Sequence, residues 1–397
     1  MLDHDLVLKS DELYLAGQIT SDGSGERAAG LYLRDTRHLS RFRLSLDGAR
    51  LTCLSERMVS AAVGVINLTN DLLRLPDGDV LPQTLFIEER AELGTALRVA
   101  VTVHNYAGRP LSLALAFEMA ADFRDLFDIR GAAPAERGAL LPPDLSTDTL
   151  ALRYNALDGR QVSTAITFDR PMHGEVLRPA TDDHAIDAEP LPDVKQVRAE
   201  PPPPPVTICR VPLPLAPGDI VTVNVTVSPH PADETESPVS ARPVLTAGSL
   251  MPRATVRSDN DFFDRFLARS DADLDLLQTT FSIGSLPAAG IPWYVAPFGR
   301  DTLIVGLQTV HVYPLRAAGI LRALAACQGA QVDPWTAEEP GKILHEVRYG
   351  EMARTGAIPH TPYYGTVDAT PLFVLLFAET VGWSDDRALY DELLPNV

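Results

Sequence analysis

The spacing of apolar residues changes once along this chain of 397 residues, and that change restricts the fold more than any other feature. Up to about residue 230, apolar and polar residues alternate in short runs such as 97–104 and 220–227, which is the pattern of half-buried strands. Turn dipeptides such as Asp47-Gly48 separate the runs. Because many short strands joined by turns are typical of a sandwich, the pattern predicts an antiparallel β-sandwich over residues 1–230.

A region of helical spacing follows a stretch rich in proline, serine, threonine and alanine. That stretch, residues 231–256, predicts a linker. Beyond it, apolar residues recur at the intervals of amphipathic helices, with Ser258 as the expected N-cap of the first helix. Helices are predicted over residues 260–277, 301–312, 315–328, 369–381 and 386–394. Residues 257–397 therefore form a separate helical part, and the chain is expected to be multidomain, β first and then α.

The charge of the chain restricts its partners. The sequence has 53 acidic and 34 basic side chains, a formal net charge of −19 at pH 7. A chain with this excess of negative charge repels nucleic acid and anionic membrane surfaces, so neither is expected as a partner. A neutral ligand is not repelled and fits the composition better.

The cysteines and the N-terminal residues both bear on the compartment. Cys53, Cys209 and Cys327 lie far apart and are odd in number, so they cannot build a full disulfide framework or a Cys-x-x-Cys metal knuckle. We expect three buried thiols in a reducing compartment. The N-terminus carries acids where a signal peptide needs basic residues, and no apolar run reaches about 18 residues, so a cytoplasmic location is expected.

No motif predicts a metal or a cofactor. His345-Glu346 begins like the zinc-binding helix His-Glu-x-x-His, but Tyr349 stands where the second histidine is required. Acids alternate around Asp273 as in a calcium loop, yet Leu276 replaces the glycine that such a loop needs. The expected chemistry is therefore one that carboxylates and water can perform without a cofactor.

Candidate binding residues gather in three blocks of the helical part, the first of which is residues 290–302. There a loop rich in proline and glycine leads into a predicted helix and carries Trp293, Tyr294, Arg300 and Asp301. Asp301 is either the cap of that helix or one half of an Arg–Asp pair that projects beside the aromatic rings. The second arrangement suits a sugar, which presents hydroxyl groups and an apolar ring face.

Two further blocks supply more polar groups. Residues 338–351 contain Glu346 and Arg348 around a Pro-Gly turn, either as an ordinary surface charge cluster or as a cleft loop. Residues 359–373 end at another predicted helix start, where Asp368 stands. Carboxylates thus recur at predicted helix starts, at Asp301 and at Asp368.

At these blocks the sequence resembles the bacterial glycogen debranching enzyme or amylo-α-1,6-glucosidase family. The resemblance lies in both halves of the chain and covers nearly all of it. The matching stretches are Trp293-Tyr294, Phe298-Gly299-Arg300-Asp301, 340–346 with Arg348, Gly350-Glu351, 363–373, 33–39 and 121–131. The resemblance implies an N-terminal β-sandwich followed by an (α/α)6 barrel, and an inverting α-glycosidase that acts on α-glucan or a related glucoside.

The resemblance also implies binding roles. Arg300 and Asp301 would grip the hydroxyls of the non-reducing terminal sugar, with Trp293 at its flank. Together with Tyr294 of the aromatic loop, these residues and others in neighbouring parts of the cleft form the predicted binding set. Its remaining members are Glu346, Arg348, Tyr363, Tyr364 and Asp368.

The chain departs from the family in length. An (α/α)6 barrel needs twelve helices, roughly 300–400 residues, whereas residues 257–397 hold about five. In the family, the general acid lies in a later Trp-x-Asp motif and the general base, a glutamate, lies further towards the C-terminus. Trp383-Ser384-Asp385 falls between two predicted helices and is not accepted as the acid. We therefore expect the catalytic pair beyond Val397, an incomplete barrel, and no activity of this chain alone.

An incomplete barrel would leave apolar side chains without neighbours and so promote self-association. The residues expected on that face are Leu372, Phe373, Leu375, Leu376 and Phe377.

Other functions stay open from the sequence. The chain could be a catalytically inactive glucan-binding module, a non-functional fragment, or a hydrolase or phosphorylase of another α-glycoside, since an Arg–Asp pair suits several hexoses. Titration with maltooligosaccharides separates the fragment from the others, because the fragment alone would bind none.

Overall fold

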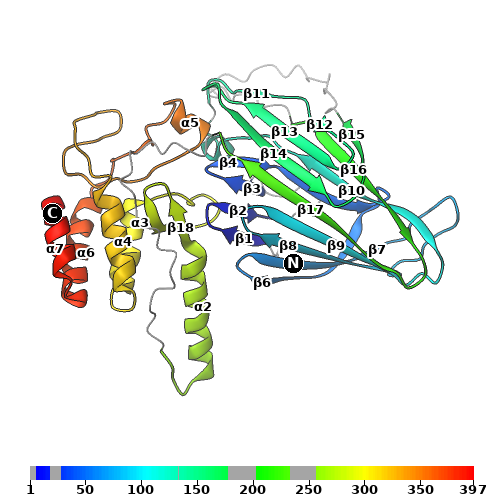
Figure 1. Cartoon of the computed structure of the whole chain (residues 1–397), viewed down its shortest axis with the longest axis horizontal. Coiled ribbons are helices and arrows are strands. Elements are labelled where there is room, and N and C mark those ends of the chain that lie inside the picture. The colour runs from blue at the N-terminus through cyan, green and yellow to red at the C-terminus, as the bar shows by residue number, and fades with distance from the viewer. Residues whose placement is uncertain (1–5, 18–27, 133, 178–202, 233–255) are drawn as a thin grey trace, which may run out of the picture.

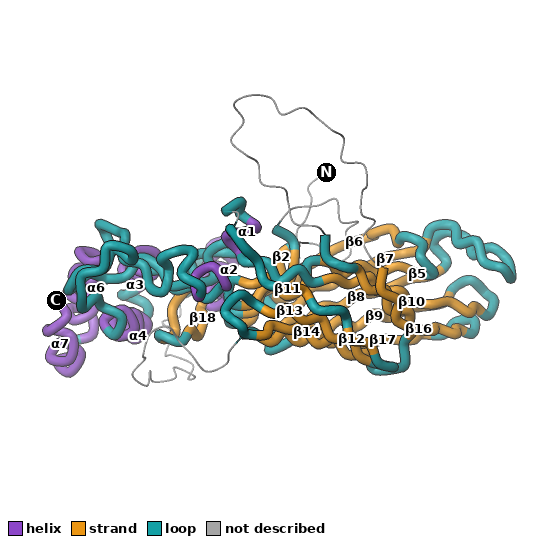
Figure 2. The backbone as a smooth tube through the Cα atoms, turned by 90° about the horizontal axis from the view of Figure 1, so that it is seen from above, coloured by secondary structure: helices purple, strands orange, loops and turns teal. Residues whose placement is uncertain are grey.

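The computed structural model describes residues 6–17, 28–132, 134–177, 203–232 and 256–397. Figure 1 shows antiparallel strands on one side of the molecule and most of the helices on the other, with the C-terminus at the helical end. Figure 2, seen from above, shows the same two parts along the long axis. The predicted β-rich region of antiparallel sheets, followed by helices, is confirmed.

The largest sheet has nine strands in the order β11-β13-β14-β17-β9-β8-β7-β6, with β12 also paired to β13. All its pairings are antiparallel. Its strands are β6 (Leu51–Ser60), β7 (Val63–Asn70), β8 (Leu85–Leu93), β9 (Leu97–Asn105), β11 (Ala139–Leu140), β12 (Asp144–Leu145), β13 (Thr149–Asn155), β14 (Gln161–Phe168) and β17 (Ile220–His230).

Two four-stranded antiparallel sheets accompany it, in the orders β15-β16-β10-β5 and β1-β2-β3-β4. Their strands are β1 (Val7–Ser10), β2 (Leu13–Ala16), β3 (Gly30–Leu33), β4 (Thr36–Leu39), β5 (Arg41–Leu46), β10 (Leu111–Ala120), β15 (His173–Leu177) and β16 (Val206–Leu215).

The sheets share one apolar core. In β9 every second side chain is buried, from Leu97 to Val103, which is the alternation predicted for a strand with one face on a core. The ring of Phe117 on β10 meets that of Phe168 on β14 edge-on, with centroids 5.5 Å apart. Because these strands belong to different sheets, the contact shows two sheets packed face to face.

The rest of the described chain forms helices and one small hairpin. The helices are α1 (Leu126–Ile129), α2 (Asp261–Leu277), α3 (Gly299–Thr309), α4 (Pro314–Ala325), α5 (Glu351–Arg354), α6 (Ala369–Ser384), α7 (Arg387–Leu393) and the 3-10 turn η1 (Leu394–Asn396), and the hairpin is β18 (Gln278–Phe281) with β19 (Gly284–Pro287). Helices α3, α4, α6 and α7 pack around a second core that includes Leu303, Ile320 and Leu376. Among the described residues, no helix combines the length and the apolar character that crossing a membrane requires.

Helix α2 begins later than the sequence predicts. Its N-cap is Asn260, whose side-chain oxygen accepts hydrogen bonds from the backbone N–H groups of Phe262 and Phe263. The prediction of Ser258 was wrong, because its hydroxyl donates instead to the carboxylate of Asp264. Serine and asparagine cap helices about equally well, so only the position of the first helical turn decides between them.

Two expectations about burial also need correction. Cys53 is exposed, because it lies on the edge strand β6. Cys209 and Cys327 are buried, and burial raises the pKa of each thiol to about 12.

The apolar face expected at α6 is only partly exposed. Phe373, Leu376 and Phe377 lie in the second core because α6 packs on α3 and α4, while Leu375 remains 55% exposed.

The division into domains stays a prediction. The linker predicted over residues 231–256 lies almost entirely in residues 233–255, outside the described part of the chain. The last described strand before it is β17 and the first helix after it is α2.

A buried arginine joins the sheets to the helical part. Arg348 is 1% exposed, and its guanidinium donates through Nη1 to Asp35 Oδ1 (2.9 Å) and through Nε to Glu346 Oε2 (2.6 Å). Asp35 lies in the turn between β3 and β4, and its other oxygen accepts from the N–H of Tyr349 (2.9 Å). An ion pair buried this deeply is stable only when both partners are present.

A second buried carboxylate lies beside this pair. Asp125, the residue immediately before α1, caps that helix by accepting from Phe127 N–H (2.8 Å). Its other oxygen accepts from the N–H of Met352 within α5 (3.0 Å). Burial and the charge of Asp35 raise the pKa of Asp125 to about 7. One carboxylate thus orders the start of two short helices that lie far apart in the sequence.

Replacing Arg348 by methionine should destabilise the chain by about 3–5 kcal/mol, because Asp35 and Glu346 would remain buried without their cation. Urea unfolding followed by circular dichroism measures the loss. The matched control is Arg387→Met, which removes an exposed pair with Asp391 on α7 and should shift the midpoint little. Equal shifts for the two variants would contradict the role assigned to Arg348.

One core position carries an unpaired acid. Glu89 on β8 is 1% exposed and lies on the same face as the buried Ile87 and Ala91. Neither of its carboxyl oxygens has a hydrogen-bond partner among the described residues. Burial, with a contribution from the charge of Glu56, raises the pKa of Glu89 to about 8.

Replacing Glu89 by methionine should therefore stabilise the chain by about 1–3 kcal/mol at pH 9, and less at pH 5. Between about pH 4.5 and pH 8 the folded chain holds a proton that the unfolded chain releases, so the wild type loses stability as pH rises and the variant does not. Urea midpoints at pH 5, 7 and 9 test this, with the neighbouring, partly exposed Glu88→Met as control. A gain independent of pH would refute it.

Candidate functional site

Three members of the predicted binding set form one cluster at the starts of two helices. Arg300 and Asp301 lie in the first turn of α3, and Asp368 is the residue before α6. Arg300 Nε is 3.7 Å from Asp301 Oδ2, and Arg300 Nη1 is 3.7 Å from Asp368 Oδ2. We call Arg300, Asp301 and Asp368 the Arg300 cluster.

The start of α3 is positioned by backbone contact. Gly299 donates its N–H to the carbonyl of His345 (2.9 Å), and a Cβ at Gly299 would lie 2.0 Å from the carbonyl oxygen of Leu344. Only glycine allows this approach, which brings the first turn of α3 against the 338–351 block. Because Phe298 is the N-cap residue, Asp301 lies inside the first turn, so it does not cap the helix.

The Arg300 cluster is accessible and charged. The side chains of Arg300, Asp301 and Asp368 are 45%, 36% and 40% exposed. A hydrogen bond from Thr366, together with the charge of Arg300, lowers the pKa of Asp368 below its usual value. Within the described residues the Arg300 guanidinium makes no hydrogen bond, since both its ion pairs are longer than a hydrogen bond. Its N–H groups and the two carboxylates can therefore bind hydroxyl groups.

The aromatic loop lies next to the start of α3. Tyr294 is 40% exposed, and its ring meets that of Phe298 edge-on at 5.8 Å. The guanidinium of Arg130 lies 5.7 Å from the ring of Trp293 and 5.6 Å from that of Tyr294. An arginine from the β part therefore covers these rings by cation–π contact. The Trp293 carbonyl accepts from Arg348 Nη1 (3.1 Å).

Glu346 and Arg348 lie inside the protein. Burial tends to raise the pKa of Glu346, but hydrogen bonds from His360 and Arg348, and their charges, lower it to about 2. His360 Nε2 is 3.2 Å from Glu346 Oε1, and Arg348 is paired as described above. Both side chains are paired inside the protein. They therefore hold the 338–351 block in place and do not line an open cleft.

The two tyrosines differ in the same way. Tyr364 is 4% exposed and donates its hydroxyl to the carbonyl of Cys327 (2.9 Å), inside the second core. Tyr363 is half-buried, with its ring 5.0 Å from that of His360 and 6.0 Å from that of His345. The structure thus divides the predicted binding set into residues that solvent can reach and residues that lie inside the protein. The accessible or partly accessible members are Trp293, Tyr294, Arg300, Asp301, Tyr363 and Asp368, and the internal ones are Glu346, Arg348 and Tyr364. Substrate binding by either group stays a prediction.

Sequence reasoning did not single out Asp35 and Asp125. Asp35 adopts a positive φ of 59° next to Arg34 at 48°, which is typical of the tight turn that joins β3 to β4, and a turn by itself gives no sign of an ion pair. No group of three or more His, Cys, Asp or Glu side chains in the described part of the chain is placed to hold a metal ion.

Comparison with solved structures finds proteins of low identity. They are a candidate aldose 1-epimerase from Escherichia coli K12 (11% identity, TM-score 0.33, covering 57% of this chain and 99% of the other), a galactose mutarotase related enzyme from Lactobacillus acidophilus (8%, 0.34, 58% and 99%) and a galactose mutarotase-like protein from Lactobacillus casei ATCC 334 (8%, 0.31, 57% and 100%). No curated protein matches the sequence.

A family comparison agrees with the resemblance seen in the sequence. The matching model describes the N-terminal domain of some glycogen debranching enzymes, and it spans the strands from β1 to β15. Residues 4–186, somewhat less than half of this chain, thus match the family model for the N-terminal domain of some glycogen debranching enzymes.

Proposed function

We propose that this chain belongs to a glycogen debranching-type glycoside hydrolase of α-glucans, and that its Arg300 cluster binds a terminal sugar of the glucan. The observation that carries the proposal is the family match over residues 4–186. The Arg300 cluster supports it, because one guanidinium and two carboxylates can hydrogen-bond several hydroxyls of one sugar ring. The net charge of −19 also favours a neutral ligand.

The same proposal assigns binding rather than proton transfer to the Arg300 cluster. An inverting glycosidase needs a carboxylic acid with a raised pKa and a carboxylate base, roughly 6.5–9.5 Å apart. The pKa of Asp368 is lowered, which suits an acceptor of hydroxyl hydrogens and not a general acid. We therefore propose that α3, α4, α6 and α7 are the first helices of an (α/α)6 barrel whose acid and base lie outside the Arg300 cluster.

Arg300→Gln should weaken the binding of maltohexaose at this cluster by at least roughly 10-fold, because it removes the charge-assisted donor between Asp301 and Asp368. Isothermal titration calorimetry on the full chain measures the affinity, and a glucose assay runs on the same samples. We expect no release of glucose.

The matched control is Arg322→Gln on α4, a comparably exposed arginine that pairs with Glu392. Unchanged affinity in the Arg300 variant would contradict the proposed site, and release of glucose by the wild type would contradict the expectation that this chain alone is inactive. If maltohexaose fails to bind while an oligosaccharide of another α-linked hexose binds, the alternative of a different α-glycoside takes precedence.

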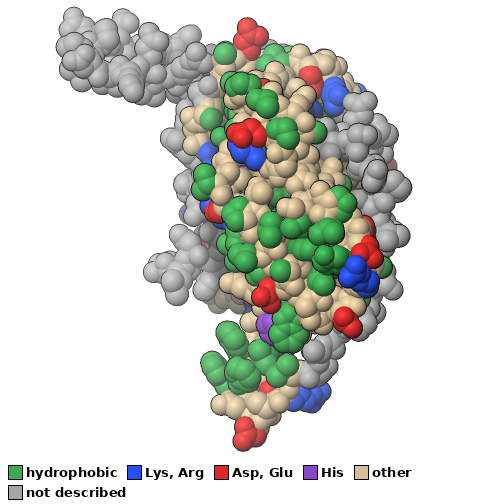
Figure 3. Space-filling model, turned by 90° about the vertical axis from the view of Figure 1, so that its left-hand side faces the viewer, with side chains coloured by type: hydrophobic (Ala, Val, Ile, Leu, Met, Phe, Trp, Pro, Cys, Tyr) green, Lys and Arg blue, Asp and Glu red, His purple; other side chains and the backbone are tan. Residues whose placement is uncertain are grey.

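We also propose that the helical end mediates self-association with a second copy of the chain. Figure 3 shows hydrophobic side chains gathered on this face. Leu375 and Trp383 on α6 are 55% and 61% exposed, and helix α2 has no buried residue, with Phe262 75% exposed. Exposed apolar side chains in such number mark an interaction surface.

Leu375→Glu should shift the chain from dimer towards monomer, because association would then bury an unpaired charge. Sedimentation velocity over a dilution series measures this shift. Leu81→Glu, a similarly exposed leucine between β7 and β8, is the control and should leave association unchanged. A monomeric wild type at all concentrations would exclude the proposed contact.

A further inference from the structure

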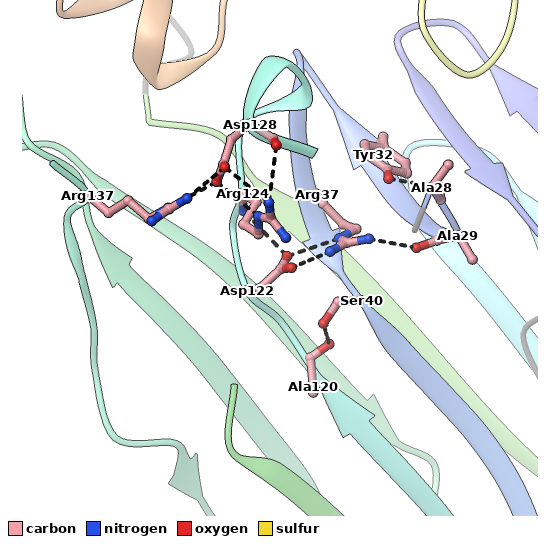
Figure 4. Close-up of polar contacts among 10 residues, drawn as sticks. All are labelled: Ala28, Ala29, Tyr32, Arg37, Ser40, Ala120, Asp122, Arg124, Asp128 and Arg137. Carbon is pink, nitrogen blue, oxygen red and sulfur yellow. Dashed lines mark hydrogen bonds and ion pairs between the residues drawn. The ribbon is translucent and has the colours of Figure 1, made fainter. Parts of the chain in front are cut away.

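A cavity of about 850 Å³ lies where the sheets meet the segment around α5, and it includes no member of the predicted binding set. Its walls come from the ends of β4 and β10, from α1 and the loop after it, and from α5 and the residues that follow. Figure 4 shows part of this wall, with Arg37, Asp122, Arg124, Asp128 and Arg137 pointing toward one another. Its volume falls within the range of small-molecule sites in proteins.

The charged side chains of the wall are held in place by ion pairs. Arg37 pairs with Asp122 through two hydrogen bonds. Asp128 accepts from Arg124 Nε (2.9 Å) and Nη2 (3.0 Å), and from Arg137 Nε (3.0 Å) and Nη2 (2.7 Å). These guanidinium groups are therefore preorganised, and a ligand would not have to order them.

Three arginine groups of the wall, those of Arg41, Arg124 and Arg137, keep unused hydrogen-bonding capacity. Within the described residues, Nη1 of Arg41, of Arg124 and of Arg137 makes no hydrogen bond. The carboxylate of Glu136, also on the wall, is exposed and has no partner in this part of the chain. The cavity thus presents free donors and free acceptors together.

The balance of charge on the wall argues against an anion. The lining contains the guanidinium groups of Arg37, Arg41, Arg124 and Arg137 and the carboxyl groups of Asp122, Asp125, Asp128, Glu136 and Glu351, without lysine or histidine. The wall therefore has five carboxyl groups and four guanidinium groups, and a phosphate would find no excess of positive charge there. A neutral ligand that both donates and accepts hydrogen bonds fits this surface.

Part of the wall is apolar. Leu140 and Leu157 line the cavity although they are 39% and 45% exposed, and Val206, Pro203 and Pro204 lie beside them. A pyranose ring has an apolar face of C–H groups and an edge of hydroxyls, so it complements a wall that is apolar on one side and charged on the other.

The cavity also bridges the two parts of the molecule. Glu351 of α5 accepts from the hydroxyl of Tyr154 (2.7 Å) and from the N–H of Leu157 (2.6 Å), both in the β part. Nearby, Arg354 Nε donates to Asp158 (2.7 Å). A ligand in the cavity would contact residues from both parts, so its binding is coupled to their docking.

We propose that this cavity is a second carbohydrate site, which binds a segment of α-glucan a few sugars long through the free Nη1 groups of Arg41, Arg124 and Arg137. This inference rests on the proposed function for the identity of the sugar, but it concerns different residues. The site lies on the β part and α5, so it would hold the glucan apart from the Arg300 cluster.

Hydrogen–deuterium exchange of the full chain with maltohexaose tests the proposal. We expect slower exchange in peptides covering 120–141 and 351–357, and separately in peptides covering 290–304 and 366–372. Absence of protection in the first pair of peptides at saturating maltohexaose would overturn the cavity site. Equal protection there by cellohexaose would overturn its assignment to α-glucan.

Variants separate the two sites. Arg137→Gln removes one free donor but leaves Arg124 paired with Asp128. The maltohexaose concentration that gives half-maximal protection of peptides covering 120–141 should rise about 10-fold. Arg153→Gln is the control and should change nothing, because Arg153 is an arginine of similar exposure that pairs with Asp144 outside the cavity.

The outcomes distinguish this inference from the proposed function. If Arg300→Gln abolishes all protection and Arg137→Gln none, the cavity site is overturned and the proposed function stands. If Arg137→Gln weakens cavity protection while the peptides of the Arg300 cluster are never protected, the cavity site stands and the proposed role of Arg300 falls. Circular dichroism of each variant shows that a loss of protection is not a loss of folding.

Discussion

The pair between Arg348 and Asp35 is the interaction on which the joint between the sheets and the helices depends. Its partners are 313 residues apart in the sequence, and both are almost fully buried. Removing two charges from water is unfavourable, so the pair persists only because each group has several partners. Arg348 binds Asp35, Glu346 and the carbonyl of Trp293, and Asp35 also accepts from Tyr349 N–H.

Both candidate binding regions extend from this joint. On one side, Arg348 holds the carbonyl of Trp293 in the loop that leads to Arg300. On the other side, Tyr349 is followed by α5, which Asp125 orders through Met352 and whose Glu351 forms a wall of the cavity. One buried arginine therefore lies between an accessible cluster of charges and the cavity, and its loss would disturb both.

Much of the fold could be predicted from local patterns. Alternation predicts strands because neighbouring side chains of a strand point to opposite faces, and this is why β9 and β17 were recognised. The helices were predicted with ends that differ by a few residues, as at Ser258 and Asn260, since several residues can serve as caps. The exposure of Cys53 could not be predicted. It follows from the place of β6 at the edge of its sheet, and that place depends on how strands from distant parts of the chain are ordered.

The sequence by itself determined the order of a β part and a helical part, the alternation of buried side chains, and the residue types at the starts of α3 and α6. Only the tertiary structure decided which charges meet. It placed Arg300 between Asp301 and Asp368, buried Arg348 against Asp35, and formed the cavity beside Arg137. The physical reason is that periodicity depends on neighbours along the chain, whereas the burial and pairing of a charge depend on groups brought together from distant segments.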